Sequence, residues 1–120
     1  MEIVDVKFKE KEYSFHYRVA GVIEKEGKYL VQQISGKDYY ILPGGHVRIG
    51  ETSIDAIRRE IKEEVGIEVD EKDCKLFCYN ENIFEREGKI EHWIEQYYII
   101  STDLELQDSW EFVEHDIDGM

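Results

Sequence analysis

The sequence is poor in proline, in cysteine and in long apolar runs. It has a single proline, and no apolar run approaches the roughly 20 residues that a membrane-spanning helix needs. The acidic N-terminus does not look like a signal peptide. We therefore expect a protein that has no transmembrane span, does not associate with membranes and works in the cytoplasm.

The two cysteines are Cys74 and Cys78, four positions apart. If both lie on one strand, their Cα atoms are too far apart for a disulfide, and two thiols alone are too few ligands for zinc. Reduced structural thiols in a cytosolic protein are the simplest interpretation.

Positive charge is also scarce, with 15 Lys and Arg against 28 Asp and Glu, a formal net charge of −13. Such a surface repels DNA, other nucleic acids and anionic membranes. It would also repel a phosphate-rich substrate, unless bound divalent cations lie between the two.

The chain, 120 residues long and 42% hydrophobic, has the size of one small domain, and we assign residues 1–120 to it. Alternating apolar residues predict strands at 3–9, 13–23, 29–34, 39–42, 74–84 and 90–100, with short strands at 67–69 and 110–113. Arg86-Glu87-Gly88-Lys89 is a good hairpin turn. Many strands and one convincing helix predict an α/β (α+β) fold with a mixed sheet.

The convincing helix follows the glycine turn Leu42-Pro43-Gly44-Gly45. Thr52 or Ser53 can cap its start, and Gly66 is suited to its end. An apolar stripe should bury against the sheet, and it consists of Ile54, Ile57, Ile61 and Val65. We expect Ala56 to project on the acidic side of the helix and leave room for a ligand.

That acidic side carries Glu60, Glu63 and Glu64, which are i, i+3 and i+4 neighbours on one strip of the helix. Three carboxylates so placed repel one another by a few tenths of a kcal/mol per pair. A hard cation such as Mg²⁺ or Mn²⁺ would offset this repulsion, because these ions prefer oxygen ligands.

This stretch resembles the Nudix box, the signature of the Nudix hydrolases. Every position of the box pattern is filled at the correct spacing, by Gly45, Glu51, Arg59, Glu60, Ile61, Glu63, Glu64, Gly66 and Ile67. The resemblance extends more loosely over about residues 17–100. It implies an α/β/α sandwich around a mixed sheet, with the box as strand, loop and helix.

The sequence departs from the family pattern at its C-terminal end. The family commonly ends in a second amphipathic helix, and residues 103–120 show no helical stripe of that length. Either the helix is missing or truncated, or another element covers that face of the sheet. A homodimer would supply such a cover.

The resemblance also implies roles for individual residues. Glu60, Glu63 and Glu64 match the catalytic, metal-binding glutamates of the family, and a backbone carbonyl of Gly44 or Gly45 would be a further metal ligand. Glu51 and Arg59 match positions that brace the loop against the helix. His46 and Arg48, inside the loop, are candidates for contacts with the substrate phosphates.

The general base stays open at this point. Glu60 is the best candidate inside the box, and Glu81, Glu85 and Glu95 are candidates outside it. By resemblance, the protein is a Mg²⁺-dependent (or Mn²⁺-dependent) pyrophosphohydrolase acting on a nucleoside diphosphate linked to another group. A nucleoside triphosphate or a nucleotide sugar is the expected substrate. The alternative is a catalytically silent module that binds a nucleotide for regulation.

Overall fold

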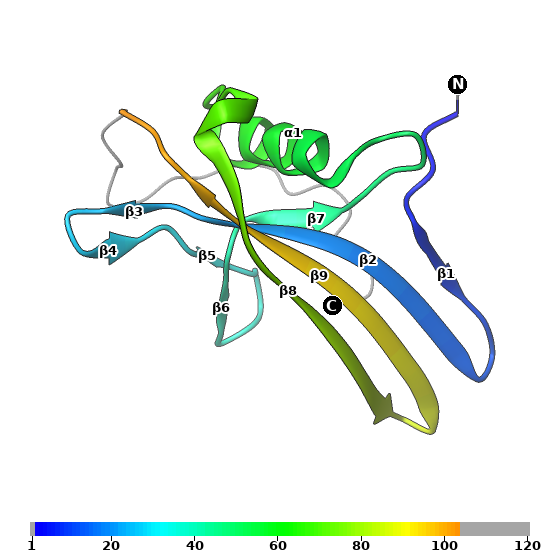
Figure 1. The fold of residues 1–120 in the computed structure, drawn as a ribbon. Helices are drawn as coiled ribbons and strands as arrows, with labels where there is room; N and C mark the ends of the chain where they lie inside the picture. Colours follow the sequence, from blue (N-terminus) through cyan, green and yellow to red (C-terminus); the bar gives the residue numbers. More distant parts are fainter. Residues whose placement is uncertain (1, 104–120) are drawn as a thin grey trace.

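The computed structural model describes residues 2–103, and these form a mixed β-sheet with one α-helix on one face (Figure 1). The α+β class and the mixed sheet predicted from the sequence are therefore confirmed. The predicted strand at 110–113 and the question of a C-terminal helix lie outside the described residues.

The main sheet has five strands. They are β1 (Lys7–Lys9), β2 (Tyr13–Val22), β7 (Gly44–His46), β8 (Cys74–Arg86) and β9 (Lys89–Ile100). The order is β1-β2-β9-β8, and β7 pairs with β2 along the same edge as β1. The central pair β2–β9 is parallel and the other pairs are antiparallel, which makes the sheet mixed.

Two small sheets lie beside the main one. They are formed by β3 (Glu24–Lys25) with β4 (Lys28–Tyr29), and by β5 (Gln32–Gln33) with β6 (Tyr40–Ile41). The single strand predicted at 29–34 is wrong, because its two ends pair with different partners. The strand predicted at 67–69 is also wrong: Ile67 and Val69 are buried in the core without a strand partner, and the 3₁₀ turn η1 (Glu71–Asp73) follows them.

Helix α1 (Ser53–Val65) begins and ends where the capping residues predict. The Thr52 hydroxyl accepts a hydrogen bond from the Asp55 N–H at 3.2 Å, so Thr52 and not Ser53 is the N-cap. Gly66 has φ 82°, a left-handed conformation that suits glycine at a helix end.

The helix packs on the sheet through Ile57 and Ile61, which are fully buried. Ala56 is equally buried in this core, so the prediction that it borders a ligand space is wrong. Close approach depends on Gly21 of β2: a Cβ there would lie 2.7 Å from Ile100 Cδ1 and within van der Waals contact of both helix isoleucines.

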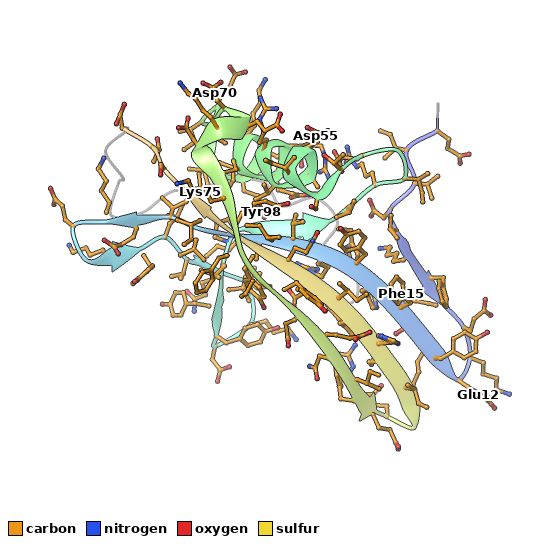
Figure 2. All side chains as sticks on the ribbon, in the orientation of Figure 1. Glu12, Phe15, Asp55, Asp70, Lys75 and Tyr98 are labelled. Carbon is orange, nitrogen blue, oxygen red and sulfur yellow. The ribbon has the colours of Figure 1, made fainter. Side chains whose placement is uncertain are left out.

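The helix covers only one end of the sheet. Figure 2 shows Tyr98 beneath α1 and Phe15 farther along the strands, beyond the helix. Every residue of β8 after Cys74 is exposed. Both cysteines lie on β8 and are free thiols, with Cys74 buried and Cys78 exposed.

Among the described residues, no helix combines the length and the apolar character that crossing a membrane requires.

Candidate active site

The glycine turn brings the loop close to both the sheet and the helix. In β7, Gly44 pairs with Ala20 and Gly45 with Val19. A Cβ on Gly44 would lie 2.0 Å from the carbonyl oxygen of Val19, so only glycine fits there. A Cβ on Gly45 would instead occupy the place of the Glu60 carboxylate, 2.5 Å from its Oε1.

Glu51 and Arg59 form the predicted brace between loop and helix. Arg59 donates from Nε to Glu51 Oε2 at 2.7 Å and from Nη2 to Glu51 Oε1 at 2.9 Å, a bidentate pair. Its Nη2 also donates to the carbonyl of His46 at 3.0 Å. Burial alone would raise the pKa of Glu51, but the hydrogen bonds from Arg59 and from the Arg48 N–H outweigh it, and the pKa lies below its usual value.

Glu60 is more enclosed than Glu63, with a side chain 14% exposed against 38%. It lies against Gly45 and accepts a hydrogen bond from Arg59 Nη1 at 2.7 Å. Burial raises the pKa of Glu60 above its usual value, because it outweighs the opposing effect of the arginine. A carboxyl group with a raised pKa is suited to proton transfer near neutral pH.

Glu64 is held by the strand side of the site. Its Oε1 accepts from Gln32 Nε2 at 3.0 Å, and its Oε2 accepts from the Gly44 N–H at 2.9 Å. The side chain of Glu63 is 38% exposed and has a long contact of 3.5 Å with Arg59. The strip therefore runs from an enclosed carboxylate to an open one.

These carboxylates have the chemistry of a hard-cation site, since all three offer oxygen and two of them, Glu60 and Glu64, lie against the backbone of the glycine turn. Within residues 2–103, no three His, Cys, Asp or Glu side chains are drawn together closely enough to hold a metal ion. A cation would have to compete with Arg59 for Glu60 and with Gln32 for Glu64.

His46 and Arg48, the two loop residues predicted to contact phosphate, contact other side chains of the protein in this structure. His46 is buried, and its Nε2 lies 2.9 Å from Nδ1 of His16. Arg48 Nε lies 3.8 Å from Asp5 Oδ1. Contact of either residue with a substrate stays a prediction.

The three glutamates outside the box lie on the β8–β9 hairpin in different surroundings. Glu81 is hydrogen-bonded to His92 at 2.9 Å on the surface, and Glu85 is exposed at the end of β8. Glu95 lies in register with Arg18 of β2, the residue that also pairs with His46. Of these three glutamates, Glu95 is thus the one that a row of paired residues, across β9, β2 and β7, connects to the glycine loop.

Sequence reasoning missed Gln32, Arg18 and His16. Each lies on a strand, and the sequence does not reveal how that strand is placed against β7 or α1. The alternation of polar residues Ser14, His16 and Arg18 along β2 was the available signal, because buried polar side chains on one strand face often mark a site.

A half-buried Arg–Glu pair fastens the loop to a glutamate-bearing helix on a mixed sheet, and this arrangement places the chain among the Nudix-type hydrolases. A family model described as NUDIX domain matches residues 14–118, and the chain belongs to that family.

Characterised relatives share the same region. The 8-oxo-dGTP diphosphatase of Haemophilus influenzae is 38% identical over 101 residues, with 65% of this chain and 74% of that protein covered. Phosphatase NudJ of Escherichia coli (strain K12) is 44% identical over 54 residues, and the match covers 43% of this chain and 35% of NudJ. The chain therefore matches most of the first relative but only about a third of the second.

Solved structures agree on the fold. A MutT NUDIX hydrolase from Burkholderia pseudomallei is 26% identical with a TM-score of 0.61, over 73% of this chain and 67% of that one. A mutator MutT protein from Bacillus halodurans has a TM-score of 0.64 at 23% identity, over 72% of this chain and 56% of that one, which speaks for the fold alone.

Proposed function

We propose that the protein is a metal-dependent pyrophosphohydrolase, cleaving the pyrophosphate bond of a small nucleoside diphosphate derivative such as a nucleoside triphosphate or a nucleotide sugar. One observation carries the proposal. The glycine turn fixes two helix carboxylates at the backbone, Glu60 against Gly45 and Glu64 on the Gly44 N–H. Apolar side chains would pack better at these two positions, so packing alone does not explain the carboxylates.

Glu60, Glu63 and Glu64, with a backbone carbonyl of Gly44 or Gly45, would hold Mg²⁺, or Mn²⁺ in its place. The bound ion supplies charge neutralisation at the phosphate oxygens and a more acidic water. The Arg59–Glu51 pair keeps the loop and the helix in register, so that the strip faces the glycine turn. Glu60 is our choice of proton acceptor, because burial raises its pKa and it lies against Gly45 of the loop.

A nucleoside triphosphate is supported by the Haemophilus influenzae relative, whose name specifies 8-oxo-dGTP. The strongly acidic surface makes long RNA the least favourable substrate. A silent nucleotide-binding module is the competing proposal. The enzyme is favoured, since a sensor has no need for three carboxylates on one strip of the helix.

Phosphate release from a panel of nucleoside triphosphates and nucleotide sugars, with Mg²⁺ and with EDTA, tests the proposal. We expect Mg²⁺-dependent hydrolysis that EDTA abolishes and that Glu63→Gln or Glu64→Gln lowers by orders of magnitude. Glu68→Gln is the matched control, because Glu68 forms a surface pair with Lys62 just beyond the helix. Unchanged turnover in the Glu63 and Glu64 variants would contradict the proposed metal site, and tight nucleotide binding without turnover would favour the sensor.

The part of the sheet beyond α1 carries exposed apolar side chains. They include Phe8, Tyr13, Tyr79, Ile83 and Ile90. That a second copy of the chain covers them stays a prediction, which sedimentation velocity tests. Location in the cytoplasm likewise stays a prediction.

A further inference from the structure

Arg18 lies in the middle of the sheet, on a row of residues that runs across three strands. It pairs with His46 of β7 on one side and with Glu95 of β9 on the other. Its neighbour Val19 belongs to the core under α1, and successive side chains alternate between faces. The Arg18 side chain is therefore on the face turned away from the helix, next to the strand that carries Gly44 and Gly45.

Arg18 is a buried residue, and within the described residues 2–103 its guanidinium forms only a long ion pair. The residue is only 7% exposed, and within residues 2–103 its closest carboxylate oxygen is Glu95 Oε2, 4.0 Å from Nε. By contrast, Arg59 donates five hydrogen bonds, and Arg58 donates from Nε to the carbonyl of Val69 at 2.8 Å. Burying a cation is costly unless its donors are paired, and a 4.0 Å ion pair leaves the Arg18 guanidinium able to donate to a further acceptor.

The neighbours of Arg18 hold it in place without using its donors. The guanidinium carbon is 5.7 Å from the centre of the Trp93 ring, a cation–π contact, and His16 stacks on the same ring at 4.2 Å. Such contacts fix the direction of a guanidinium and leave its N–H groups available.

Arg18 is also close enough to the proposed active site to act on it. It pairs with His46, the residue that follows Gly45, and the Glu60 carboxylate lies against Gly45. The two side chains belong to opposite faces of the sheet, and these faces meet at β7, which is an edge strand at this point. A substrate with several linked phosphates would have to pass around that edge to contact both groups.

We propose that Arg18 binds a phosphate group of the substrate, at a subsite separate from the carboxylates that hold the metal. This inference rests on the proposed function, since it assigns a second point of attachment to the same substrate. A planar guanidinium offers two parallel donors to phosphate oxygens, and a chain of net charge −13 needs such a fixed cation to retain a polyanion. The competing role is structural, with Arg18 acting only as the countercharge of Glu95.

Binding of inorganic pyrophosphate in EDTA separates the two roles, because no metal-dependent hydrolysis takes place there. Calorimetric titration into millimolar concentrations is expected to show binding by the wild type and a loss of about 10-fold or more in Arg18→Gln. Arg18→Lys keeps the charge but loses the planar pair of donors, and is expected to bind with intermediate affinity. Lys28→Gln removes one charge from the exposed strand β4 and is expected to bind like the wild type.

Thermal unfolding of each variant identifies any that fails to fold, and Arg18→Lys then carries the test alone. Equal affinity of the wild type and the folded Arg18 variants overturns the inference, and so does an absence of binding by the wild type, since a fixed guanidinium needs no metal. If the wild type hydrolyses nucleotides while Arg18 variants bind pyrophosphate normally, only the inference fails. If Arg18-dependent binding is present but no nucleotide is hydrolysed, only the proposed function fails.

Discussion

Two adjacent glycines in the loop before α1 are required for different reasons. A Cβ on Gly44 would collide with the backbone of β2, at the carbonyl of Val19 and at Cα of Ala20. A Cβ on Gly45 would collide only with the carboxylate of Glu60. The first glycine therefore maintains strand pairing, and the second leaves room for an active-site side chain.

Gly45→Ala is expected to lower activity far more than stability. The Glu60 carboxylate has to leave its place beside the loop, whereas the backbone pairing of β7 with β2 can persist. Gly44→Ala, the matched variant one position earlier, should disrupt that pairing and unfold the protein at lower temperature. Hydrolysis rates and thermal unfolding midpoints of the two variants check this, and equal loss of stability in both would contradict it.

At the scale of single residues, the sequence predicted the relative positions of side chains that lie within or next to one helix. Glu60, Glu63 and Glu64 are on one strip and Arg59 bonds to Glu51, as the box pattern implied. It could not predict that Gln32 bonds to Glu64 or that Arg18 lies beside His46. Those neighbours depend on strand register between distant segments, which no local pattern encodes.

At the scale of elements, the helix was predictable because its ends carry local chemical signals. Thr52 and Gly66 mark them, and the apolar stripe gives the buried face. The hairpin of β8 and β9 was also predicted, since its turn at Glu87-Gly88 lies between two long apolar strands. The segment 29–34 was mispredicted as one strand because Tyr29 pairs with β3 whereas Gln32 and Gln33 pair with β6, a division that its apolar pattern does not show.

A pH-sensitive side-chain contact joins β2 and β7, where Nδ1 of His16 lies 2.9 Å from Nε2 of His46. His16 is fully buried, and burial lowers its pKa from 6.5 to about 4, with Lys9, Arg18 and Lys7 acting in the same direction and Glu91 against it. The folded state thus favours neutral His16. The resulting stability is fully present above about pH 6.5 and is lost as the pH falls toward 4.

The free energy of unfolding is expected to fall by about 2 kcal/mol between pH 7 and pH 5 through this residue. His16→Gln should remove most of that dependence, and it should lower the stability at every pH because the stack on Trp93 is lost. Urea denaturation at the two pH values measures it. Glu91, whose pKa is lowered, adds its own loss only below about 4.5 and so does not affect this window. An equally steep dependence in His16→Gln would refute the assignment.

At the scale of the whole molecule, the net charge of −13 is concentrated enough to make cations stabilising in general. A specific metal site should add to that effect. Free Mg²⁺ at about 100 times its dissociation constant would stabilise the folded state by about 2.7 kcal/mol.

Mg²⁺ is therefore expected to raise the unfolding temperature by several degrees beyond the effect of NaCl at equal ionic strength. The excess should disappear in Glu64→Gln and persist in Glu68→Gln. Differential scanning calorimetry provides the measurement. An identical response to both salts would mean that Mg²⁺ acts on the overall charge alone.

The parallel pairing of β2 with β9 has a consequence for how the chain is made. The two strands at the centre of the sheet are encoded near opposite ends of the described sequence, 13–22 and 89–100. During synthesis, β2 leaves the ribosome long before its partner exists, whereas β8 and β9 can form their hairpin as soon as both have emerged. The β2–β9 contacts join residues far apart in the sequence, so the sheet is completed late. In that step the β8–β9 hairpin docks onto the N-terminal part of the chain, which is synthesised earlier.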